Sequence, residues 1–255
     1  MKNWKENILA PLLFTVALLI LWELACRVFS LPATVLPTPT AIAKAMVQYW
    51  PAIWENSLQT LVTTLLGFAL AIVAGLALGI GIGWSKFIYG ALYPVMIAFN
   101  AIPKVAVVPI LIIWFGIGTI PAIFTAFLIS FFPIVVNVAT GLATTEPELQ
   151  DVLRALGASK LDIVRKVGIP RSMPYFFGSL KVAITLAFVG SVVSETIGAN
   201  SGLGQMMLAA QAGFNVELVF AGVMALAILG IALYAITALI EKRFTGWAFR
   251  AEGIG

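Results

Sequence analysis

The sequence predicts an all-α integral membrane protein with about six transmembrane helices. Of its 255 residues, 61% are hydrophobic and only 10% are charged, whereas a soluble domain carries about 25% charged residues. The mean hydropathy is +1.05. The apolar runs are continuous rather than alternating, and only helices or closed barrels satisfy the backbone in lipid, so these runs indicate helices.

Six apolar segments are long enough to span a bilayer, because a transmembrane helix needs roughly 20 mostly apolar residues. They cover about 8–29, 57–84, 87–114, 119–142, 174–198 and 216–240. The first run is too long for a signal peptide and no A-x-A cleavage site follows it, so we expect it to be retained. We therefore divide the chain into residues 1–56, a first span with an external loop, and residues 57–255, a five-helix core. In the loop, residues 41–50 favour an interfacial helix that braces the first span, with contact to an external partner as the alternative.

The distribution of Lys and Arg predicts the orientation of the chain. If the N-terminus is cytoplasmic, only Arg27 and Lys44 fall in outside segments. The inside segments then hold Lys2, Lys5, Lys86, Arg154, Lys160, Arg165, Lys166, Arg171, Lys242, Arg243 and Arg250. Because cytoplasmic loops are enriched in Lys and Arg, both termini and residues 143–173 are predicted to be cytoplasmic.

The second span carries small residues at every fourth position. Ala71, Gly75, Gly79 and Gly83 form a ridge on one helix face, where the backbone of another helix can approach closely. This pattern predicts packing and identifies no function.

The third span contains Pro103, Pro109 and Lys104 inside an apolar run. Proline removes a helix hydrogen bond, and broken helices at membrane depth line cavities or are shielded by protein. An ion inside the membrane is a functional-site hypothesis by default. Lys104, with Asn100 one turn earlier, is therefore a candidate for the translocation pathway or a gate; a snorkelling or structural role is the alternative.

Two further polar residues fall inside apolar spans. Asn137 lies in the middle of the fourth span, and Glu195 lies near the outer end of the fifth. Both are pathway or gate candidates. For Glu195 three interpretations remain open: it faces the pathway, it pairs with Lys104, or it binds the outer backbone. Residues 198–215 are punctuated by Gly and too polar to span, so we expect an outer cap or a re-entrant piece.

Residues 145–170 form the longest polar interruption of the chain. Two patterns in it are typical of helix starts: Thr145 with Glu148, and Ser159 with Asp162. They predict two amphipathic helices joined at Gly157, the second ending at Pro170. The apolar face of such a pair must be buried on something. The chain's own helix ends, the lipid headgroups and a soluble partner all remain open.

The sequence also narrows the chemistry. It has no His and one Cys, Cys26, which excludes imidazole metal sites and disulfides within the chain. It has no G-x-x-x-x-G-K-[ST] phosphate loop, so we expect no enzyme activity and no cofactor on this chain. An intramembrane enzyme would have only Glu195 with a Ser, and no nucleophile–base pair is evident. A secondary transporter driven by an ion gradient remains an alternative, although one broken helix is seen rather than an inverted pair.

Residues 151–170 resemble the EAA loop, E-A-A-x3-G-x9-I-x-L-P, of permease subunits of ATP-binding-cassette importers. Asp151 stands at the Glu position, Gly157 at the Gly position and Pro170 at the Pro position. The departures are Asp for Glu, and Val152 and Leu153 for the two alanines. The resemblance extends over roughly 55–247, and these stretches look like the nitrate/sulfonate/taurine branch of the family.

This resemblance implies a homodimer of permease subunits, two cytoplasmic ATP-binding subunits that carry ATP and Mg, and an external substrate-binding protein that is periplasmic or lipid-anchored. It implies a multi-pass protein of the bacterial cytoplasmic membrane, in contact with lipid and with no nucleic acid. The expected contacts with the ATPase are Asp151, Arg154, Ala155, Leu156, Gly157, Ala158 and Pro170. Gly157 would need either to be small or to adopt a backbone that other residues resist. The implied cargo is a small solute: an organic or inorganic anion, or a related aromatic or pyrimidine compound.

Overall fold

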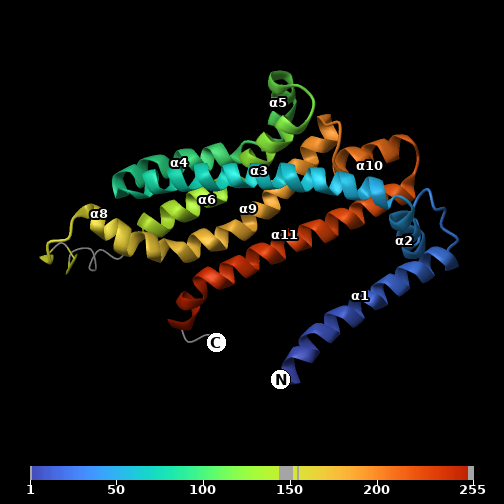
Figure 1. Ribbon diagram of the computed structural model, residues 1–255, viewed down its shortest axis with the longest axis horizontal. Helices are drawn as coiled ribbons and strands as arrows, with labels where there is room; N and C mark the ends of the chain where they lie inside the picture. Colours follow the sequence, from blue (N-terminus) through green and yellow to red (C-terminus); the bar gives the residue numbers. More distant parts are fainter. Residues whose placement is uncertain (1, 144–151, 154, 252–255) are drawn as a thin grey trace.

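The computed structural model describes residues 2–143, 152–153 and 155–251, and every regular element in that part of the chain is helical (Figure 1). In chain order the elements are α1 (Lys2–Val28), α2 (Pro39–Gln48), α3 (Trp50–Gly83), α4 (Lys86–Ala101), η1 (Lys104–Val107), α5 (Val108–Phe115), α6 (Thr119–Ala143), α8 (Lys160–Ile163), η2 (Val164–Gly168), α9 (Ile169–Gly198), α10 (Leu203–Ala212) and α11 (Val216–Ala251). The all-α class is confirmed.

The prediction of about six spans is confirmed. Five helical segments in the described residues are long and apolar enough to cross a membrane: Leu9–Val28, Trp50–Gly83, Thr119–Ala143, Leu161–Gly198 and Val216–Gly246. The sixth is a bent pair, Phe87–Ala101 with Lys104–Phe115, whose two halves meet at 72°. The break falls at Pro103, where the sequence predicts it.

The two ends of the bundle differ (Figure 1). The short helix α8 lies at one end, and α2 and α10 lie at the other. The turn between α5 and α6 belongs to the second end, because the backbone N–H of Gly118 donates to the carbonyl oxygen of Gly198, 3.2 Å away. We refer to these as the α8 end and the α10 end.

The centre of the bundle is formed by α3, α6 and α9, and the predicted ridge of small residues is its tightest seam. Ala71 is fully buried. A Cβ atom at Gly75 would lie 2.7 Å from Ile134 Cγ2, and one at Gly79 would lie 2.7 Å from Val138 Cβ. The ridge therefore brings the α3 backbone directly against the side chains of α6, as small residues in membrane helices allow.

Helix α2 buries one face against the bundle. It begins at an N-cap, Thr38, whose hydroxyl oxygen accepts the backbone N–H of Ala41. Ile42 and Ala45 then pack into a core with Leu203 of α10 and with α11. The helix braces the first span as predicted, and it also ties that span to the α10 end of the bundle.

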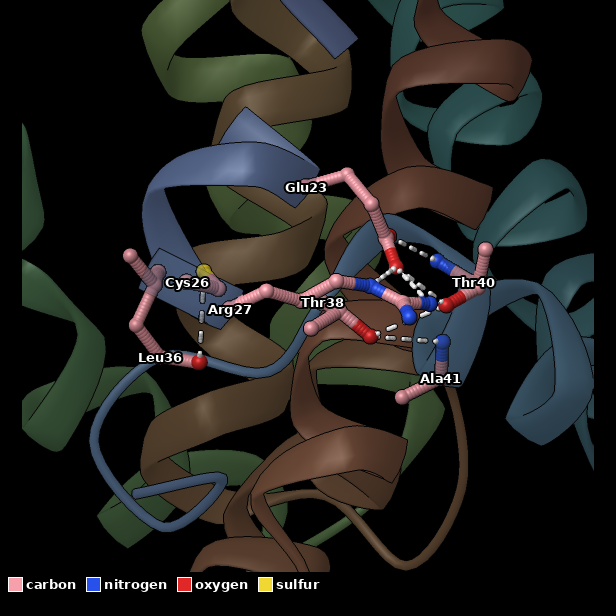
Figure 2. Close-up of polar contacts among 7 residues, drawn as sticks. All are labelled: Glu23, Cys26, Arg27, Leu36, Thr38, Thr40 and Ala41. Atoms are coloured by element: carbon pink, nitrogen blue, oxygen red, sulfur yellow. Dashed lines mark hydrogen bonds and ion pairs between the residues drawn. The ribbon is translucent and has the colours of Figure 1, made fainter. Parts of the chain in front are cut away.

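Helix α1 diverges from the bundle toward the N-terminus (Figure 1). It is held near its C-terminal end by a polar cluster, shown in Figure 2. Glu23 Oε1 accepts Arg27 Nε at 2.7 Å and the Thr40 hydroxyl at 2.9 Å, and Glu23 Oε2 accepts the Thr40 backbone N–H at 3.1 Å. Beside this cluster, the ring of Trp22 lies 6.2 Å from that of Phe220 on α11. The residues from Leu9 to Leu21 are largely exposed.

Pro170 does not end a helix, which corrects the prediction. The chain runs from α8 through a π-helical turn, Val164–Gly168, directly into α9, and Pro170 occupies the first turn of α9. Proline is tolerated there because its missing N–H has no role in a first turn. A π turn changes the hydrogen-bond register, so the carbonyl that the proline ring would meet is displaced. The fifth span consequently begins well before residue 174.

Candidate functional site

The exposed turn at Gly157, at the α8 end, holds Ala155, Leu156, Gly157 and Ala158 of the predicted ATPase contacts, whereas Pro170 lies in the first turn of α9. Gly157 has φ +84°, and a Cβ atom added there would meet nothing within 4 Å. The backbone N–H of Ala158 donates to the carbonyl oxygen of Leu153 at 3.0 Å, which is the long-range bond of a Schellman motif. The left-handed backbone therefore accounts for this glycine within the chain, and no neighbouring atom of the chain requires it to be small.

The helix start predicted at Ser159 is confirmed. The Asp162 backbone N–H donates to Ser159 Oγ at 3.2 Å, and the Ser159 backbone N–H donates to Asp162 Oδ2 at 3.3 Å. This reciprocal pair is a capping box with Asp as the acid. The other predicted start, Thr145 with Glu148, lies outside the described residues, as do Asp151 and Arg154.

The apolar side chains of this turn are not covered by the bundle. Leu156 is 77% exposed, Leu161 is 61% exposed and Val152 is 57% exposed. A groove runs beside them, lined by Leu153, Leu156, Gly157, Ala158, Asp162, Ile163, Lys166 and Val167. Docking on the chain's own helix ends, one of the three options left open by the sequence, does not occur for these exposed residues.

A continuous helical path joins this turn to the α10 end. It runs from α8 through η2 and α9 to Gly198. Halfway along, Lys181 Nζ lies 2.6 Å from Glu241 Oε2 on α11, and the rings of Phe177 and Phe244 stack at 5.2 Å. A displacement of the Gly157 turn would therefore be carried along α9, with α11 attached to it.

Asn100 and Lys104 come together at the break of the third span, as their spacing predicts. Lys104 Nζ donates to Asn100 Oδ1 at 2.7 Å and to the Asn100 carbonyl oxygen at 3.1 Å. The ammonium also lies 5.8 Å from the ring centroid of Phe132. A cation at a helix C-terminus is stabilised by the helix dipole, so Lys104 caps the C-terminal end of α4.

Asn137 and Glu195 do not join that pair. Asn137 Nδ2 donates to the Pro133 carbonyl oxygen of its own helix at 2.8 Å. Glu195 is 1% exposed, and its Oε2 accepts the backbone N–H of Gly204 at 3.1 Å. Of its three open interpretations, this contact matches binding to the backbone at the outer end.

The sequence analysis missed the partners of Glu195. Its carboxylate is surrounded by hydroxyl groups of Thr60 and Thr63 on α3 and of Ser191 on α9. A signal was present, since Thr60, Thr63 and Thr64 form a polar patch at the start of an apolar span. What could not be read was that this patch faces a carboxylate more than a hundred residues away.

Comparison with known proteins agrees with this architecture. The family model described as "Binding-protein-dependent transport system inner membrane component" matches residues 71–246. The chain is 32% identical to the formylaminopyrimidine transport permease protein ThiX of Halalkalibacterium halodurans, over 94% of this chain and 96% of that protein. It is 31% identical to a probable ABC transporter permease protein of Haemophilus influenzae, over 90% and 94% of the two chains.

Other similarities are more distant. The chain is 28% identical to a putative aliphatic sulfonates transport permease protein, SsuC, of Bacillus subtilis, over 98% of this chain and 90% of that protein. Among solved structures, an inward-facing MetNI methionine ABC transporter chain matches with a TM-score of 0.64 at 23% identity, covering 78% of this chain and 97% of that chain. At that identity the likeness shows the fold. From the family match and the full-length relatives, the chain belongs to the inner-membrane components of binding-protein-dependent transport systems, the permease subunits of ABC transporters.

Proposed function

We propose that two copies of this permease subunit form the translocation pathway of an ATP-driven importer, and that each presents its Gly157 turn to a separate ATPase subunit. ATP and Mg would be held by that ATPase, so the chain itself would need no cofactor. An external binding protein would deliver the solute to the opposite side. Both termini and the α8 end would face the cytoplasm of a bacterial cell.

The observation that carries this proposal is the exposed apolar turn at the α8 end. Leu156 and Ala158 flank a glycine with a left-handed backbone, and the groove beside them is open. Apolar side chains exposed at the tip of a capped turn suit insertion into a cleft of a partner protein. The helical path from α8 to Gly198 then supplies the mechanical link between partner and pathway.

The translocation pathway is proposed to include the break of the third span. Lys104 is half-buried there, and Asn100 is exposed beside it. An ammonium group at membrane depth favours an anionic solute. Because Asn137 bonds to its own helix and Glu195 is buried among hydroxyls, we give these two residues structural roles instead.

The cargo class follows from this charge and from the relatives. Similar proteins include permeases named for the transport of taurine, aliphatic sulfonates, formylaminopyrimidine and riboflavin. We propose a small solute, either an organic or inorganic anion or a related aromatic or pyrimidine compound. Its identity would be selected mainly by the external binding protein.

Reconstitution tests the proposal. The permease would be placed in liposomes with the ATPase and the binding protein that are encoded beside it. Uptake of taurine, an alkanesulfonate, a formylaminopyrimidine and riboflavin would then be measured with and without ATP. We expect one solute class to be accumulated only when ATP and both partners are present.

The broken third span also suits a secondary transporter, which would be driven by an ion gradient. Uptake by the permease alone under an imposed proton or sodium gradient would support that alternative. It would also overturn the ATP-driven mechanism.

A further inference from the structure

The carboxylate of Glu195 is the centre of a buried polar cluster at the α10 end. Its Oε2 accepts the Thr60 hydroxyl at 2.9 Å and the Gly204 backbone N–H at 3.1 Å. Its Oε1 lies 3.3 Å from the hydroxyl oxygens of both Thr63 and Ser191. The side chain is 1% exposed, and Thr60, Thr63 and Ser191 are as deeply buried. The Glu195 carboxylate therefore accepts hydrogen bonds from three helices, α3, α9 and α10.

Together with Asn56, the same cluster supplies the partners of three backbone N–H groups at the N-terminal end of α10. The N-cap residue Gly202 has no side chain with which to cap the helix. Instead, its backbone N–H donates to Asn56 Oδ1 at 2.8 Å, and the Leu203 N–H donates to Thr60 Oγ1 at 2.9 Å. The Gly204 N–H donates to Glu195. The first N–H groups of a helix have no partner within that helix, so here α3 and α9 provide the partners.

The backbone of α10 is shaped to admit this carboxylate. Gly202 has φ +109°, a conformation that L side chains rarely adopt. A Cβ atom there would lie 2.5 Å from Glu195 Oε2, and one at Gly204 would lie 2.8 Å from Glu195 Cβ. Both glycines therefore leave the space that Glu195 fills.

We infer that Glu195 is a positioning residue that fixes α10 to α3 and α9, so that α10 moves with these two helices during the transport cycle. The motion that enters at the Gly157 turn travels along α9, and Glu195 lies on the last turn of α9 before α10. The cluster thus transmits that motion from α9 to α10. The effect on transport rests on the proposed function; the attachment of α10 does not.

Two substitutions separate this role from that of a charge in the pathway. Glu195→Gln keeps an oxygen that can face Gly204 and Thr60, and its amide NH2 can donate to the Thr63 and Ser191 hydroxyls. Glu195→Met has a similar length and no comparable acceptor, so it leaves the Gly204 N–H buried without its partner. A hydrogen-bonded attachment survives the first change and fails in the second. A role that needs negative charge fails in both.

The test measures a distance and a rate on the full-length permease. Cysteines replace the exposed residues Ala52 on α3 and Gln211 on α10 in a Cys26→Ala background. Labelled copies are mixed with an excess of unlabelled Cys26→Ala permease, so that the spin labels report the distribution of distances within one copy. We expect a single narrow distribution in the parent and in Glu195→Gln, and one about twofold broader or more in Glu195→Met. ATP-driven uptake should stay within about threefold of the parent in Glu195→Gln and fall about tenfold or more in Glu195→Met.

Each other result overturns the inference. A narrow distribution in Glu195→Met would show that the carboxylate does not hold α10. Equal loss of uptake in both variants, with narrow distributions, would instead give Glu195 a charge-dependent role in the pathway.

If the Met variant does not reach the membrane, Thr60→Val removes the hydroxyl that joins Oε2 to the Leu203 N–H. It should broaden the distribution, and an unchanged width would count against the inference. Absence of ATP-driven uptake in the parent would contradict the proposed function. The distance measurement would still test whether Glu195 attaches α10 to α3 and α9.

Discussion

At the scale of single residues, the backbone of Gly157 carries the most direct prediction. Its φ of +84° costs an ordinary L residue about 1–2 kcal/mol, whereas Asn tolerates the left-handed region. We expect Gly157→Val to shift the turn and to reduce uptake per ATP hydrolysed by about tenfold. The reason is that the proposed contacts with the ATPase depend on the backbone conformation of the turn. Parallel measurement of phosphate release and solute uptake in proteoliposomes checks this.

The matched control for that prediction is Gly157→Asn. Since an added Cβ atom meets nothing within 4 Å, this variant should keep most of the coupling. If Asn and Val reduce coupling equally, then the size of the side chain, pressed against the partner ATPase, matters and the conformation does not.

Lys104 shows how a single residue can have a structural explanation and still remain a candidate for function. Its ammonium donates two hydrogen bonds to Asn100, which accounts for a cation at the interruption of a span. An ammonium carries three N–H groups, so these two bonds leave one donor. The structural contact and the proposed contact with an anionic solute are therefore compatible.

At the scale of elements, the seam between α3 and α6 makes a prediction about stability. A Cβ atom at Gly79 would lie 2.7 Å from Val138 Cβ and 3.0 Å from the Val135 carbonyl oxygen, while one at Gly81 meets nothing within 4 Å. Gly79→Ala should force the two helices apart and lower the free energy of unfolding by about 1–3 kcal/mol.

Gly81→Ala is the control within the same helix. It should be neutral or stabilise the protein by up to about 1 kcal/mol, because Ala has the higher helix propensity. The melting temperatures of the Gly79→Ala and Gly81→Ala variants are compared by heating the detergent-solubilised permease and measuring the remaining folded fraction by size-exclusion chromatography. Similar melting temperatures would mean that the seam is looser than the structure shows.

The helix from α8 to α9 illustrates how an element can override a local signal. Pro170 and Pro174 both occur in a region where proline favours a helix end, yet the helix continues through both. The π turn at Val164–Gly168 and the placement of Pro170 in a first turn remove the conflict at Pro170, whereas Pro174 lies inside α9. The continuity matters, because a break at residue 170 would separate the Gly157 turn from the rest of the fifth span.

At the scale of the whole molecule, the distribution of charge predicts which end faces the cytoplasm. Arg165, Lys166 and Arg171 are exposed at the α8 end, and Arg27 and Lys44 belong to the α1–α2 region at the other end. Following the positive-inside rule, the α8 end should be cytoplasmic.

Cysteine labelling checks this orientation in a Cys26→Ala background. Phe214→Cys, at a site 86% exposed near α10, should react with a membrane-impermeant maleimide in intact cells. Leu156→Cys, at a site 77% exposed in the Gly157 turn, should react only after the membrane is permeabilised. The opposite pattern would reverse the orientation, and with it the assignment of the turn to a cytoplasmic ATPase.

Features that depend on composition and on local spacing could be predicted from the amino-acid sequence. These include the membrane-spanning segments, the break at Pro103, the small-residue ridge on the second span and the helix start at Ser159. Each of them is a property of one continuous stretch of sequence, since apolar length, helical periodicity and capping all act between residues that are close in the chain. The EAA-like spacing in residues 151–170 indicated the protein family, which the pattern of a single helical turn does not identify.

Contacts between residues far apart in the sequence became visible in the folded chain. Glu195 lies 135 residues from Thr60, and no local pattern states that the two share a hydrogen bond. The burial of α2 against Leu203 and the caps of α10 likewise come from other elements. The physical reason is that a buried polar group must find a partner, and in this chain the partners of Glu195 are supplied by the packing of α3, α9 and α10.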